Sequence, residues 1–106
     1  MRIRKNTGIE KEEAVLIANC SDALAHPVRV ELFKYIYNEN MDRKICCNKD
    51  LVENFGYAQS TISQHMSRLI GAELIEVKKS GTRVEYYVNL GILQKYLNTV
   101  KKLNEH

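Results

Sequence analysis

Hydroxyl and amide side chains gather along one side of residues 58–69, which read AQSTISQHMSRL. Helical spacing places them on a single face, formed by Gln59, Ser60, Ser63, Gln64 and Ser67. Glutamine can hydrogen-bond to two edge atoms of adenine, and serine can bond to any base or to phosphate. The free N–H groups of a helix N-terminus also favour a phosphate. The pattern therefore predicts a helix whose N-terminal half enters a groove of DNA.

An apolar stripe runs along the other side of the same segment. Ile62, Met66 and Leu69 repeat at helical spacing and are expected to anchor the helix to a core. Arg68 comes near the end of the helix, where it is expected to reach a backbone phosphate. A solvated surface helix would show the same two sides, so the interpretation depends on the neighbouring elements.

A basic hairpin follows this helix. Apolar and polar residues alternate over residues 74–90, which predicts a β-hairpin with its tip at residues 79–83. Lys78, Lys79 and Arg83 stand at or beside that tip. Cationic side chains there suit contact with phosphates or with the minor groove, and the combination with the polar helix favours DNA binding.

Four further helices are expected from the periodicity of the remaining chain, over residues 7–25, 27–39, 48–55 and 91–106. Thr7 and Glu10 have capping-box spacing, and Asn48 is the expected N-cap of the third of these helices. The residues between, KICC at 44–47, are expected to be extended. The order predicts a mainly α protein with a small β-hairpin, a winged helix-turn-helix with flanking helices at both ends.

Length and composition agree with one folded domain over residues 1–106. Residues 1–8 carry Arg2, Arg4 and Lys5 and are expected to form a disordered basic arm. The net charge of +3 permits nucleic-acid binding without requiring it. The sequence shows neither a membrane-spanning apolar run nor a signal peptide, so we expect a cytoplasmic protein with no membrane partner.

Three stretches resemble the ArsR/SmtB family of bacterial winged-helix repressors: ALAHPVRVELFKYI, AQSTISQHMSRLIGAELIEVKKSGTRVEYYV, and the first and last helices as a pair. The resemblance implies a homodimer that represses transcription from a palindromic operator until an effector releases it. It implies DNA contacts through the hairpin and through Gln59, Ser60, Thr61, Ser63 and Gln64. One departure is Ala58, at a position where the family often has a serine cap.

The resemblance also implies that the first and last helices form the dimer interface. The apolar residues expected there are Val15, Leu16, Ile92, Leu93, Tyr96, Leu97 and Val100. Two helices with such broad apolar surfaces exceed what a thin domain can cover, which is an independent reason to expect a dimer.

Cys20, Cys46 and Cys47 leave open whether the protein senses an effector through sulfur. Many relatives use a Cys-x-Cys pair for soft ions, but Lys49 occupies the position of the second sulfur here and has no lone pair to donate. A three-thiolate site for a metal or metalloid, a redox-active pair and three small buried apolar residues remain alternatives. No resident cofactor is expected.

Catalysis is not expected, because the histidines lack a serine or cysteine constellation and the chain has no phosphate-binding glycine loop. The alternative to a DNA-binding regulator is a winged-helix module that binds only other proteins. Such a module would need the apolar stripes but neither the serine and glutamine face nor the basic hairpin tip.

Overall fold

The computed structural model describes residues 6–106, so the predicted basic positions Arg2, Arg4 and Lys5 lie outside the described residues. Its elements in chain order are α1 (Lys11–Ala23), α2 (Pro27–Met41), β1 (Cys46–Cys47), α3 (Asn48–Phe55), α4 (Gln59–Gly71), β2 (Ile75–Ser80), β3 (Arg83–Val88), α5 (Leu90–Val100) and the short 3-10 helix η1 (Lys101–Asn104). The predicted mainly α architecture with a small β-hairpin is confirmed. None of the helices in this part of the chain is long and apolar enough to span a membrane.

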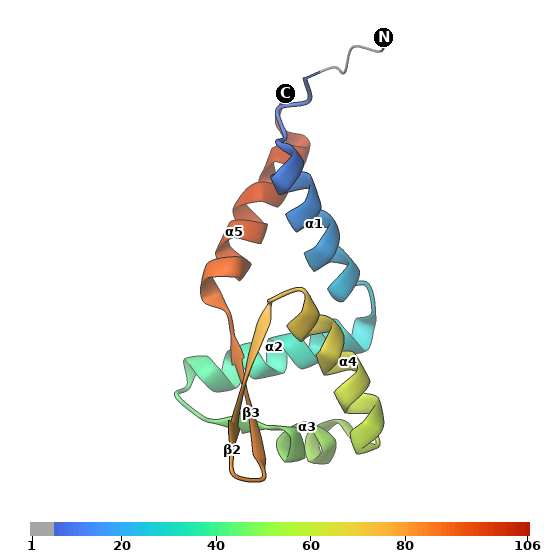
Figure 1. The fold of residues 1–106 in the computed structure, drawn as a ribbon, viewed down its shortest axis with the longest axis vertical. Helices are drawn as coiled ribbons and strands as arrows, with labels where there is room; N and C mark the ends of the chain where they lie inside the picture. Colours follow the sequence, from blue (N-terminus) through green and yellow to red (C-terminus); the bar gives the residue numbers. More distant parts are fainter. Residues whose placement is uncertain (1–5) are drawn as a thin grey trace.

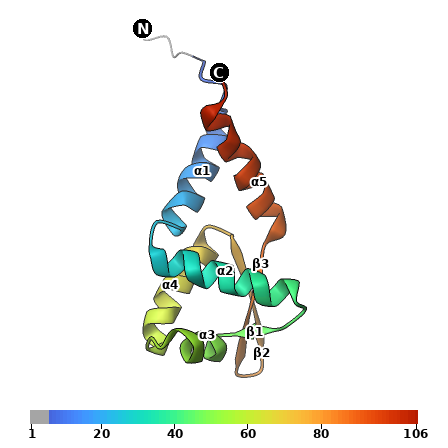
Figure 2. The ribbon, with the colours of Figure 1, turned by 180° about the vertical axis from the view of Figure 1, so that it is seen from behind.

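The molecule is elongated, with extents of 55 × 26 × 24 Å. Helices α2, α3 and α4 and the sheet form a body, whereas α1 and α5 run antiparallel and converge at the far end, where the C-terminus lies (Figures 1 and 2). We call α1, α5 and η1 the stem. The hairpin tip, α3 and the start of α4 lie together at the end of the body opposite the stem (Figure 1).

The core lies in the body, where α2, α3 and α4 meet the sheet. Its largest side chains are at most 1% exposed: Leu32, Ile36, Leu51, Ile62, Met66, Leu69, Leu74 and Ile75. Helix α4 supplies Ile62, Met66 and Leu69, the stripe that its periodicity predicted. Burying these residues fixes the rotation of α4 about its own axis, so its polar face must point outward.

The sheet is antiparallel in the order β1-β3-β2. The hairpin pairs Ile75 with Val88 and Ser80 with Arg83, and Gly81 adopts a φ of 65° in the turn. Along the other edge of β3, β1 pairs with Glu85 and Tyr86. Next to β1 along the same edge of β3, the side chain of Asn40 bonds to the backbone of β3, as a neighbouring strand would. Its Oδ1 accepts from the N–H of Val88 at 2.8 Å, and its Nδ2 lies 3.4 Å from the carbonyl oxygen of Tyr86.

The predicted start of the first helix was wrong by one turn. Helix α1 begins at Lys11, and its capping box is formed by Glu10 and Glu13 rather than by Thr7 and Glu10. The N–H of Glu10 donates to Oε1 of Glu13 at 2.9 Å. Both pairs have the same spacing, so spacing alone did not distinguish them.

The predicted cap of α3 was wrong by one residue. Cys47 is the N-cap, and its N–H donates to a carboxylate oxygen of Asp50 at 2.8 Å. Cys47 is extended because it pairs with Glu85 in the sheet, so the helix can start only after it. Asn48 instead donates from its side chain to the Tyr86 hydroxyl at 2.8 Å.

Two predicted helix ends were also too late. Helix α1 ends at Ala23 rather than near Ala25, and α5 ends at Val100, where the tighter η1 takes over. Gly56 ends α3 as predicted, with a φ of 71°.

Candidate functional site

The polar face of α4 is exposed along its N-terminal half. Gln59, Ser60, Ser63 and Gln64 are exposed, and Thr61 is half-buried. Ala58 precedes the helix and supplies no side-chain hydrogen bond to its first turn, within the residues that the structure describes. The first-turn N–H groups are therefore available to an outside acceptor such as a phosphate.

A groove of about 440 Å³ runs between this face and the hairpin. Gln59 and Ser63 line it from α4, and Thr82 and Arg83 line it from the hairpin. The start of α3 contributes Asn48 and Lys49, which the sequence reasoning did not place at the site. The predicted order of elements could have placed them there, because the first helix of a helix-turn-helix crosses the DNA backbone beside the second helix.

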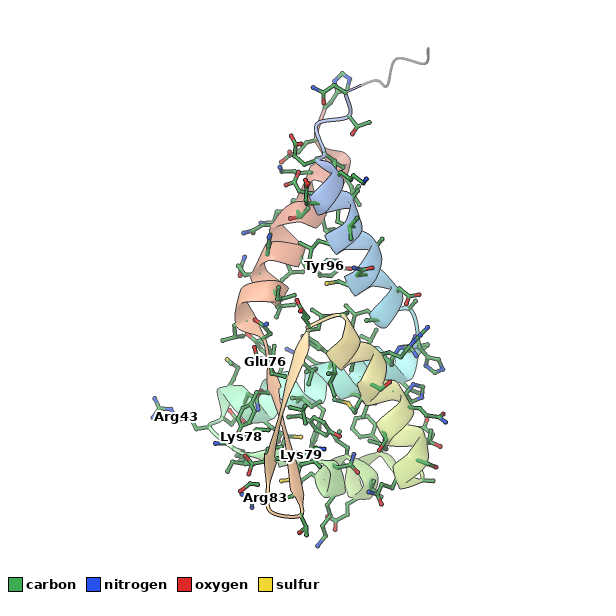
Figure 3. All side chains as sticks on the ribbon, in the orientation of Figure 1. Arg43, Glu76, Lys78, Lys79, Arg83 and Tyr96 are labelled. Atoms are coloured by element: carbon green, nitrogen blue, oxygen red, sulfur yellow. The ribbon has the colours of Figure 1, made fainter. Side chains whose placement is uncertain are left out.

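The three predicted hairpin cations do not act as one cluster. Lys78 pairs across the hairpin with Glu85, and Lys79 with Val84, so alternation puts the two lysines on opposite faces of the sheet. Arg83 lies at the tip end of β3, and its guanidinium bonds to Glu85. Figure 3 shows the three residues along the lower part of the hairpin.

Arg68 is not brought to this groove. It lies near the C-terminal end of α4, and its Nη2 is 3.7 Å from Oδ2 of Asp22 in α1. Both side chains are more than half exposed, so this ion pair is weak and the guanidinium is accessible. A contact with DNA would have to come from a strand that passes the stem end of α4.

His65 ties α4 to the joint between α1 and α2. Its ring centroid is 4.8 Å from that of His26, and its Nδ1 is 3.5 Å from Nη1 of Arg29. Arg29 in turn donates from Nε to the carbonyl oxygen of Ala23 at 2.7 Å. Burial, and then His26 and Arg29, lower the pKa of His65, so it is neutral at pH 7. This residue positions α4 rather than facing the groove.

The three thiols are in different places. Cys20 and Cys46 are fully buried, whereas Cys47 is partly exposed in the groove. Burial is the main reason that all three thiol pKa values are raised, that of Cys46 to about 12. A thiolate is the form that binds soft metals and reacts. Within residues 6–106, no three His, Cys, Asp or Glu side chains lie close enough together to hold a metal ion.

Some of the predicted dimer residues pack against the core of the same chain, whereas others are exposed. Leu16, Ile92, Leu93 and Tyr96 pack against the core. Val100 is half-buried, whereas Val15 and Leu97 are about half exposed, at 50% and 47%. Tyr96 also bonds through its hydroxyl to Ser21 at 3.0 Å, between α5 and α1 (Figure 3).

A helix pair joined by a short turn and followed by a two-stranded wing defines a winged helix-turn-helix protein. Solved structures share this fold. An ArsR-like transcriptional regulator from Rhodococcus sp. RHA1 matches with a TM-score of 0.70 and 20% identity over 85% of this chain and 80% of that one. NolR from Sinorhizobium fredii matches with a TM-score of 0.60 and 20% identity over 98% and 97%.

Sequence comparison gives the family. The model described as bacterial regulatory protein, arsR family, matches residues 26–77. Arsenical resistance operon repressors are similar, from Staphylococcus aureus at 34% identity over 55% of this chain and from Staphylococcus xylosus at 32% over 71%. The matched segments span 56% and 66% of those relatives, less than two thirds of each. The chain belongs to the ArsR family, whose members are transcriptional regulators rather than enzymes.

Proposed function

We propose that this protein is a homodimeric repressor that binds a palindromic DNA operator through α4 and the wing. The observation that carries the proposal is the exposed face of Gln59, Ser60, Ser63 and Gln64, which borders a groove shared with Arg83 of the wing. Short hydroxyl and amide side chains on a helix that begins without a side-chain cap suit close approach to base edges and phosphates.

The repressor role is supported by the names of the relatives, which are operon repressors. The dimer is supported by the exposed apolar residues of the stem, among them Val15 and Leu97. A palindromic operator requires two copies of α4 about 34 Å apart, one turn of DNA, and a two-fold axis through the stem would relate them. Such a protein acts in the cytoplasm.

A binding selection from a random-sequence duplex library tests this function. We expect the purified protein to enrich one palindromic sequence and to bind it far more tightly than an unselected duplex. The logarithm of the affinity should fall linearly with the logarithm of the salt concentration, by about 0.9 per phosphate contact. A control protein with Gln59, Ser63 and Gln64 all changed to alanine should retain weak binding to any duplex but enrich no sequence.

The same experiment also tests the alternative, a winged-helix module that binds only other proteins. That module would retain no duplex even at low salt. Its affinity for its protein partner would not depend on the triple substitution. Failure to bind any duplex at low salt would therefore overturn the proposed function.

A further inference from the structure

The wing contains a buried carboxylate that holds an arginine. Glu85 is only 4% exposed. One of its oxygens, Oε2, accepts from Nε of Arg83 at 3.0 Å and from Nη2 at 2.7 Å. The other, Oε1, accepts from the Tyr87 hydroxyl at 2.8 Å. We call Arg83, Glu85 and Tyr87 the wing clasp.

The clasp follows from the register of the sheet. Its three residues alternate along β3 and therefore share one face. On that face Glu85 is flanked by Lys78 of β2 and by Cys47 of β1, its partners across the two neighbouring strands. The Tyr87 hydroxyl and then Arg83 lower the pKa of Glu85, so the carboxylate stays ionised at neutral pH.

Arg83 belongs to the clasp and to the groove at once. Its side chain is 54% exposed, and the residue borders the groove at the tip end of β3, across from Gln59 and Ser63 of α4. The clasp engages Nε and Nη2, so Nη1 can still donate to a phosphate. A long arginine side chain normally loses much rotamer freedom when it binds, and a partner that fixes it beforehand removes part of that cost.

We propose that Glu85 is a positioning residue for DNA binding, which fixes the Arg83 guanidinium at the tip end of the wing, beside the groove. This inference rests on the proposed function, because it assigns a role within the same interface. It makes a counterintuitive prediction. A carboxylate near DNA repels phosphates, so its removal should strengthen binding if charge alone mattered, whereas the loss of positioning should weaken it.

The sign of the effect of Glu85→Gln on operator affinity tests the proposal. We expect binding about 2- to 12-fold weaker, the range that corresponds to immobilising one flexible side chain. Glu76→Gln is the matched control, because Glu76 is an exposed carboxylate on β2 of the same hairpin (Figure 3). Although Glu76 lies across the hairpin from Tyr87, it takes no part in the hydrogen bonds of the clasp. The control therefore removes the same charge, leaves those bonds in place and should leave binding unchanged or slightly tighter.

A double-mutant cycle separates positioning from a general effect on the fold. If Glu85 acts through Arg83, Glu85→Gln should no longer weaken binding in an Arg83→Ala background. A structural role would weaken binding in both backgrounds. Tyr87→Phe keeps every charge and frees one carboxylate oxygen, so it should weaken binding in the same direction as Glu85→Gln but less.

Arg83→Lys adds a variant that leaves Glu85 in place. It keeps the positive charge but cannot form the forked contact with the carboxylate, so we expect it to bind more weakly than the parent. Parent-like or tighter binding by Glu85→Gln, or an equal loss in the Arg83→Ala background, would overturn the positioning role. Failure of the parent to bind any duplex would overturn the proposed function instead, so the two failures are distinguishable.

Discussion

The body and the stem are both built from amphipathic helices, but they bury their apolar residues to different extents. In the body, α4 buries its apolar stripe completely: Ile62, Met66 and Leu69 are at most 1% exposed. In the stem, Thr99 is the buried residue of α5, while Leu90 and Leu97 are 51% and 47% exposed. At the outer end of the stem, α1 and η1 are joined by an ion pair of 2.6 Å between Lys102 and Glu13.

This difference indicates that the body and the stem have different roles. The body closes its own core, so the wing and the exposed polar face of α4 are positioned within one chain. We call that face, formed by Gln59, Ser60, Ser63 and Gln64, the reading face after its proposed role. The stem leaves apolar surface that a second copy would cover, and it would therefore set the distance between two reading faces. Substitutions in the body should act first on folding or on DNA contact, whereas substitutions in the stem should act on assembly.

The largest expected effect is on the core of the body. Leu69→Ala should lower the free energy of unfolding by about 2–5 kcal/mol, because it removes a fully buried side chain and leaves a cavity. Leu97→Ala is the matched control in the stem and, in the monomer, should cost much less. Urea titration at low protein concentration measures both. Equal losses would contradict the difference in burial.

A charge in the stem should break the dimer without unfolding the chain. Leu97→Glu places a carboxylate in the proposed seam, and we expect the dimerisation free energy to weaken by about 2–4 kcal/mol, as at an interface hot spot. Sedimentation at micromolar concentration should show a dimeric parent and a monomeric variant. A monomeric parent, or a variant that stays dimeric, would remove the stem from the interface. Glu substitution at exposed Asn98 is a suitable control.

The reading face should affect specificity and leave folding alone. Gln64→Ala is expected to lower affinity for the selected operator by about 1–3 kcal/mol, the value of one good contact to a base. The thermal midpoint should not change, because Gln64 is exposed. Gln94→Ala, an exposed glutamine of α5, provides the comparison. Parent-like operator affinity in the Gln64 variant would count against this face.

The wing should contribute charge that does not depend on sequence. Lys79→Ala should weaken binding to operator and to unselected duplex alike, and it should reduce the salt slope by about 0.9, the contribution of one phosphate contact. Lys95→Ala in α5 alters the net charge equally, far from the groove. An unchanged slope for Lys79→Ala would exclude that residue from the interface.

A smaller, pH-dependent effect on the free energy of unfolding is expected where His65 of α4 contacts His26 and Arg29. The folded-state pKa of His65 is lowered by burial, His26 and Arg29, so the unfolded chain binds protons more readily there. The stabilising effect of the neutral ring is complete above the unfolded pKa of about 6.5 and is lost as the pH falls through the folded value. Asp22 and Arg68 are the nearby charges from α1 and α4. His65→Gln should flatten the stability profile below pH 6.5, and an unchanged profile would contradict this assignment.

Much of the site could be predicted because it depends on local periodicity. The spacing of Ile62, Met66 and Leu69 determined which side of α4 is buried, and therefore which residues are exposed. Alternation and Gly81 located the hairpin and its turn. The caps of α1 and α3 were placed wrongly, because several residues have suitable types and spacing and the sequence does not rank them.

Tertiary structure decided how these elements combine. The sequence by itself determined the helices, the wing and the polar face, since each depends on residues that are neighbours along the chain. It did not determine that β1 would pair with Glu85 and thereby make Cys47 the cap of α3. Nor did it show that Arg68 lies beside Asp22. Arg83, Glu85 and Tyr87 share a face by simple alternation, but only the assembled sheet buries the carboxylate, because the flanking strands exclude water from it.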